Sequence, residues 1–196
     1  MNTRNSYLIS RAFRNYFWAS LLTSAAMQLT VTVDAIVVGH FIGSDALAAI
    51  SLVMPLTMVV SALSTLIGVG PAIIASKAIG NREFEKVNMV FTSAFFQSLI
   101  IGVCIVAGIR VFHQEIASLI CSNGNLLPYL ESYLKVLPYG FLLAIIVSML
   151  VSLVEADGYP GLAAKATMAG CLWHIVLGVL CVGYMGMGIQ GVAYAM

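Results

Sequence analysis

Residues 32–55, TVDAIVVGHFIGSDALAAISLVMP, place a single carboxylate, Asp34, inside a long apolar run. No Lys or Arg lies between Arg14 and Lys77, so no basic residue nearby in the sequence neutralises it. A short turn over residues 40–45 separates this run from a second apolar run. Two long apolar runs joined by a turn are typical of consecutive membrane-spanning helices, in which an isolated charge is costly.

The composition of the whole chain points the same way. Of its 196 residues, 61% are hydrophobic and 9% are charged, whereas a soluble domain carries roughly 25% charged residues. The mean hydropathy is +1.00, which indicates lipid as the solvent. The net charge of +1 argues against a nucleic-acid partner, because such binding requires a basic surface. We therefore predict an all-α fold, a polytopic transmembrane helix bundle.

Long uncharged runs separate clusters of charged residues along the chain. A membrane-spanning helix needs about 20 apolar residues to cross roughly 30 Å of hydrocarbon. The first run is too long for the apolar core of a signal peptide and lacks an obvious cleavage site, so we expect it to be retained. The predicted spans, assigned to one domain over residues 1–196, lie near 14–40, 47–75, 87–110, 130–153 and 164–184, and a sixth begins near 187 and is cut off by the C-terminus.

Two of the expected elements differ from a simple span. The second span would be about 45 Å long as a helix, so it must tilt, bend or project beyond the bilayer. Pro55 and the sequence GVGP at 68–71 are the expected bending points. Ahead of the fourth span, Ile116, Leu119 and Ile120 have helical spacing. That segment is either a short interfacial helix or the beginning of the fourth span.

The basic residues predict the orientation, because Lys and Arg accumulate in cytoplasmic loops. Seven of them precede the first span or lie between the second and third or the fourth and fifth: Arg4, Arg11, Arg14, Lys77, Arg82, Lys86 and Lys165. Arg110 and Lys135 lie on the opposite side. We therefore expect the N-terminus and the loop IGNREFEK in the cytoplasm and the turn at 40–45 outside.

The sequence contains no catalytic or metal-binding pattern. The four cysteines have no CxxC spacing, so we infer neither a disulfide framework nor a metal site, and we expect no cofactor. There is no HExxH, no GxSxG and no pair of intramembrane carboxylates. We therefore do not expect an enzyme.

Asp34 is the main functional candidate. It lies about 10 Å inside the expected outer end of the first span. One interpretation is a carboxylate that reaches the outer interface, although the short Asp side chain reaches less far than Lys or Arg. The other is a carboxylate that faces a wet bundle interior and binds either a proton or a hard cation such as sodium. Either ligand would couple an ion gradient to a change of shape.

Four segments, in this order and spacing, resemble the multidrug and toxic compound extrusion (MATE) family of cation-coupled antiporters. They are VDAIVVGHFIGSDALAAISLVMP (33–55), IGVGPAIIASKAIGNREFEK (67–86), EADGYPGLAAKATMAG (155–170) and GMGIQGVAYAM (186–196). The resemblance implies twelve helices in two six-helix lobes, with substrate carried in the cleft between them. This chain then looks like the N-terminal lobe with its sixth helix barely started, and one lobe alone cannot perform alternating access.

The resemblance also implies a cation site, in which the first-helix Asp joins polar residues of the fourth, fifth and sixth helices. Asp34 matches that Asp, and Tyr133 matches a tyrosine of the same network. His174 and Gly178 replace the Asn and Asp of the family's fifth helix, and Met196 replaces a Thr of the sixth. The candidate cation-binding residues are therefore Asp34, Tyr133 and His174.

The lost oxygen ligands favour a proton over sodium as the coupling ion, because sodium prefers several oxygen atoms. Histidine changes its charge readily near neutral pH, so His174 is suited to share a proton with Asp34. Two alternatives remain. His174 is a neutral, packed side chain, or the site in this lobe is inactive and coupling resides in the other lobe.

We therefore expect a proton-coupled antiporter that exports drugs or other amphipathic organic compounds across the plasma (inner) membrane of a prokaryote. Its expected partners are the lipid bilayer, small organic substrates and the missing C-terminal lobe. The alternative is a lipid-linked-precursor flippase or polysaccharide exporter of related architecture. Those cavities usually need basic residues for phosphate, which the middle of the predicted spans lacks.

Overall fold

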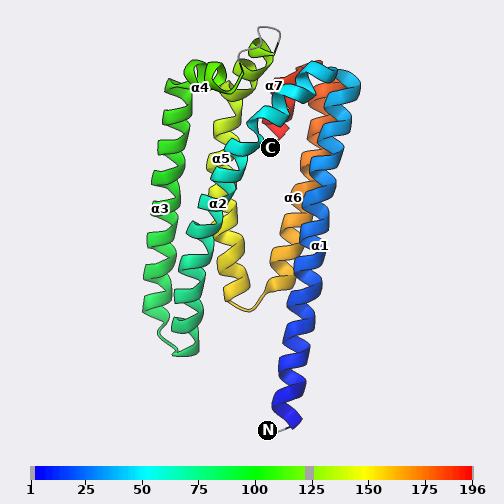
Figure 1. Cartoon of the computed structure of the whole chain (residues 1–196). Helices are drawn as coiled ribbons and strands as arrows, with labels where there is room; N and C mark the ends of the chain where they lie inside the picture. The colour runs from blue at the N-terminus through cyan, green and yellow to red at the C-terminus, as the bar shows by residue number, and fades with distance from the viewer. Residues whose placement is uncertain (1–2, 122–125, 196) are drawn as a thin grey trace.

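The computed structural model describes residues 3–121 and 126–195, which are helical almost throughout (Figure 1). The elements are α1 (Thr3–Phe41), α2 (Ser44–Gly80), α3 (Phe84–Val111), α4 (His113–Ile120), α5 (Leu127–Ala156), α6 (Pro160–Val179), the π-helical segment η1 (Leu180–Tyr184) and α7 (Ile189–Ala195). No strand occurs in these two ranges. The predicted all-α transmembrane bundle is confirmed.

Among the described residues, five segments are long and apolar enough to cross a membrane: Phe13–Phe41, Ser44–Gly80, Phe84–Val111, Leu127–Ala156 and Pro160–Tyr184. The helices run past the expected limits of the spans, because the helical backbone continues into the polar flanks. The turn expected over residues 40–45 is correspondingly too long, since only Ile42 and Gly43 separate α1 from α2. Gly43 permits this tight connection, because its φ of 119° is rarely adopted by other residues.

The long helices form two groups (Figure 1). Helix α2 packs on α5 and α3, whereas α1 packs mainly on α6. Helix α2 begins beside the end of α1 and slants across to the beginning of α3, so it tilts as its length requires, with Pro55 and Pro71 inside it. The short α7 contacts α5, α6 and η1 and so connects the two groups.

Helix α5 is the centre of the packing. Its fully buried residues include Leu130, Leu134, Leu137, Phe141 and Ile145, which follow helical spacing and so form one inward face. Small residues let the neighbouring helices approach closely. A Cβ atom on Gly68 of α2 would lie 3.2 Å from the Ser148 carbonyl oxygen of α5, and a Cβ atom on Gly102 of α3 would collide with Leu142.

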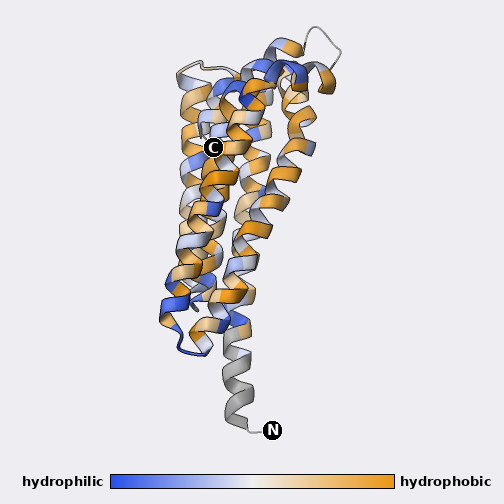
Figure 2. Cartoon of the chain, turned by 90° about the vertical axis from the view of Figure 1, so that its left-hand side faces the viewer, coloured by the Kyte–Doolittle hydropathy of each residue, from blue (hydrophilic) through white to orange (hydrophobic). Residues whose placement is uncertain are grey.

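Helix α4 is a separate element that lies across the end of the bundle opposite the N-terminus (Figure 1). It packs on α5 and α3 through the buried Ala117, while Leu119 is 88% exposed. This arrangement matches the short interfacial helix and not the beginning of the next span. We call this end of the bundle the α4 end. Figure 2 shows apolar residues along the middle of the long helices and hydrophilic residues toward both ends, as a bilayer requires.

Candidate functional site

Asp34 lies in the last third of α1, on the face that packs against α6. Helix α1 continues for about two turns beyond it, to Phe41. Val38, one turn further along the same face, is fully buried. The Asp34 side chain is 25% exposed. The carboxylate is therefore held among packed helices.

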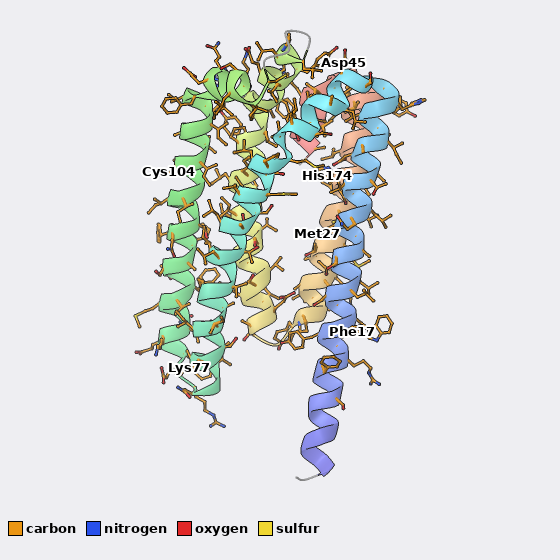
Figure 3. The ribbon with its side chains drawn as sticks, viewed as in Figure 1. Phe17, Met27, Asp45, Lys77, Cys104 and His174 are labelled. Carbon is orange, nitrogen blue, oxygen red and sulfur yellow. The ribbon has the colours of Figure 1, made fainter. Side chains whose placement is uncertain are left out.

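His174 of α6 is the direct partner of Asp34. Its Nε2 atom lies 2.9 Å from Oδ2 and 3.1 Å from Oδ1 of the carboxylate. The His174 side chain is 16% exposed, and Figure 3 shows it beside α1. The two residues are 140 positions apart in the sequence, and the packing of α1 on α6 brings them together.

The distances require a proton between the two groups. An ionised carboxylate only accepts hydrogen bonds, so at 2.9 Å either Nε2 carries the proton and donates it, or the carboxyl group is protonated and donates to Nε2. In the first state the imidazole can take up a second proton on Nδ1. The pair then passes from a net negative charge to an internally neutral ion pair. This geometry is therefore suited to bind and release one proton within a partly buried site.

Gly178, one turn after His174, lies on the same side of α6. A Cβ atom at this position would lie 3.7 Å from Asp34 Oδ1 and 3.9 Å from the Cβ atom of Ala195. Position 178 therefore faces Asp34, as the resemblance implies for the family's fifth-helix Asp, but it offers no side-chain ligand. Met196, the position matched to the sixth-helix Thr, lies outside the described residues.

Tyr133 of α5 is 6% exposed and lies near enough to Asp34 for the two groups to interact electrostatically. No hydrogen bond joins its hydroxyl group to Asp34 or His174 within the described part of the chain. The structure therefore brings all three candidate residues into one region, but only Asp34 and His174 are in direct contact.

Sequence reasoning missed two neighbours of the site. Ala195 of α7 packs beside Gly178, and the π-helical segment η1 begins two residues after Gly178. A π-helical turn widens the helix and is frequent at functional sites. The only sequence signal was the glycine-rich run GYMGMG, in which Gly186 and Gly188 adopt positive φ angles.

Comparisons with known proteins agree with this architecture. The family model MatE matches residues 19–180. The multidrug export protein MepA of Staphylococcus haemolyticus (strain JCSC1435) is 26% identical over 156 residues, which cover 80% of this chain and 34% of MepA. MepA of Staphylococcus aureus (strain MSSA476) is 24% identical over 158 residues, which cover 79% of this chain and 35% of that protein. The chain thus spans about a third of the length of these curated relatives.

Solved structures give the same result. An outward-facing multidrug resistance MATE family transporter of the MOP superfamily superposes with a TM-score of 0.88 at 25% identity, covering 94% of this chain and 41% of that chain. A MOP superfamily transporter from Pyrococcus furiosus superposes with a TM-score of 0.87 at 25% identity, and the match covers 94% of this chain and 40% of that transporter. Since the family model covers most of the sequence and the fold matches throughout, the chain belongs to the MatE family, the multidrug and toxic compound extrusion transporters.

Proposed function

We propose that this chain is the proton-binding N-terminal lobe of an antiporter that exports drugs or other amphipathic organic compounds. The observation that carries this proposal is the 2.9 Å contact between His174 Nε2 and Asp34 Oδ2 inside the membrane-spanning bundle. An ionisable pair inside the membrane is energetically costly, so its presence there indicates a function. The MepA relatives, which are multidrug export proteins, support the substrate class and favour it over a flippase or polysaccharide exporter.

The ligand set supports a proton over sodium. In the described part of the chain, the side-chain atom that bonds the Asp34 carboxylate is the His174 Nε2 nitrogen, while the nearby Tyr133 hydroxyl does not bond it and Gly178 offers no side-chain ligand. Hard cations such as sodium prefer several oxygen ligands, and imidazole nitrogen suits them poorly. In the described ranges, no group of three or more His, Cys, Asp or Glu residues could hold a metal ion. A proton needs only the two atoms that are already in contact.

Protonation of the pair could also change how the helices around it pack. Asp34 and His174 form a polar link between α1 and α6, and α6 packs on α7. A change in the charge of the pair alters the attraction across this link in a region of low dielectric constant, where it is strongest. We infer that this change shifts α1 relative to α6 and α7 and so biases the lobe between two states.

The orientation and the second lobe belong to the same proposal. The distribution of Lys and Arg favours a cytoplasmic N-terminus, and the relatives favour a prokaryotic plasma membrane. The α4 end then faces outward, and Asp34 is reached by protons that enter from outside. The substrate cleft would lie between this lobe and a second lobe, because alternating access needs two bodies that move against each other.

The test is export of a fluorescent organic cation from liposomes that contain the assembled transporter, this lobe together with its second lobe. We expect an imposed pH gradient to drive export and an equal sodium gradient at constant pH to have no effect. Liposomes with this lobe alone, at one copy per vesicle, serve as the control and should not transport. Export that follows the sodium gradient would refute proton coupling, and the lack of any export with both lobes would refute the proposed function.

A further inference from the structure

The two basic residues at the α4 end meet, although they come from different helices. Arg110 is near the end of α3 and Lys135 is near the beginning of α5, whereas the other seven of the nine Lys and Arg residues lie toward the opposite end. The Arg110 Nη1 atom donates a hydrogen bond of 3.2 Å to the Lys135 backbone oxygen. The guanidinium carbon also lies 5.9 Å from the centre of the Tyr139 ring. Arg110 is therefore held in place beside Lys135.

Neither cation is neutralised by an acidic side chain in the part of the chain that the structure describes. Both side chains are exposed, and neither forms an ion pair within residues 3–121 and 126–195. The acidic residues at this end are Asp45, Glu115 and Glu131, of which Glu131 is one turn from Lys135 on α5. None of them lies within ion-pair distance of either cation. The two positive charges therefore remain available to an external anion.

The surface below these cations is apolar and faces outward. On α5, Tyr139, Leu143 and Val147 follow Lys135 at intervals of four residues and are 50%, 59% and 54% exposed. Residues at this spacing share one face of a helix. The distance from Lys135 to Val147 along the axis is about 18 Å, close to the thickness of one hydrocarbon leaflet of roughly 15 Å. The cations thus lie at headgroup level above a stripe that an acyl chain can cover.

We propose that Arg110, Lys135 and Tyr139 form a binding site for an anionic phospholipid. The guanidinium group and the ammonium group would hold the phosphate, since a guanidinium fork matches two phosphate oxygens. The acyl chain would lie along Leu143 and Val147. An anionic lipid fits better than a zwitterionic one, because the cation of a choline headgroup would meet two unneutralised positive charges. This site would hold a lipid of the shell around the protein, and it is independent of the proposed proton site.

The test is native mass spectrometry of the purified chain with phosphatidylglycerol or phosphatidylcholine of the same acyl composition. We expect the wild type to bind phosphatidylglycerol about tenfold more tightly, since each cation near an anionic headgroup contributes a factor of several. R110Q/K135Q should abolish this preference. K135Q alone should reduce it severalfold without affecting the fold, because the Lys135 side chain makes no described polar contact. K77Q/R82Q, which removes two exposed cations from the opposite end, is the matched control and should keep the preference.

Two further results would overturn the site. One is an equal affinity of the wild type for the two lipids, or a preference in K135Q that is as large as in the wild type. The other is displacement of phosphatidylglycerol by an equal concentration of inorganic phosphate, which would indicate a site for free phosphate. Circular dichroism of each variant verifies that the helices are intact.

Discussion

At the scale of single residues, Asp34 is the side chain on which the account of coupling depends. Asp34→Asn keeps the size of the side chain but removes its charge and its ability to exchange a proton. We expect gradient-driven export to fall to background. Removing an intramembrane aspartate charge relieves up to about 2.5–3.5 kcal/mol, while losing a charged hydrogen bond costs about 1.5–3 kcal/mol.

These two effects oppose each other, so the free energy of unfolding should change little. Unfolding in mixed micelles measures it, and export from liposomes measures function. An Asp34→Asn variant that exports like the wild type, with the same pH dependence, would remove the basis for a coupling role of this lobe.

His174 is the second residue at this scale. His174→Gln keeps a hydrogen-bond donor for Asp34 but cannot become an imidazolium. If the two side chains share the coupling proton, export should fall or its pH optimum should move, because the remaining carboxylate must bind the proton alone. Export measured over a range of pH values tests this. If His174 is only a packed side chain, stability will change and the pH profile will not.

At the scale of elements, the close approach of α3 to α5 depends on Gly102. Gly102→Val would push a branched side chain into Leu142, so we expect a loss of about 1–3 kcal/mol in the free energy of unfolding. Gly108→Val is the matched control on the same helix, because a Cβ atom there meets nothing within 4 Å. It should change stability by less than about 0.5 kcal/mol. Equal effects of the two variants in mixed micelles would contradict the packing described for α3 and α5.

The elements also show how far the sequence could predict the structure. Hydropathy located the five spans, because lipid imposes one length and one composition on them. The pairing of His174 with Asp34 was accessible through the positions that match the family. The length of the turn around Gly43 and the π-helical segment η1 were not, because both depend on backbone conformations that hydropathy does not encode. The contact between Arg110 and Lys135 depends on the packing of α3 on α5, which cannot be predicted from a local sequence pattern.

At the scale of the whole molecule, the prediction concerns the direction of insertion. The basic residues at the N-terminal end favour a cytoplasmic location for that end. In a background without the native cysteines, an impermeant thiol reagent should label Gln114→Cys in intact cells. Ser6→Cys and Asn81→Cys should react only after the membrane is opened. Labelling of Asn81→Cys from outside would invert the topology and place the α4 end in the cytoplasm.

The shared proton is the central claim, and NMR of ¹⁵N-labelled histidine in the 196-residue chain tests it most directly. The chain has three histidines, and His174→Gln identifies the signals of His174. We predict that the His174 Nε2 signal shows a hydrogen bond to a carboxyl group, that this signal moves in Asp34→Asn, and that sodium leaves it unchanged in the wild type. A His174 Nε2 signal that is unchanged in Asp34→Asn, or that sodium alters in the wild type, would contradict the shared proton.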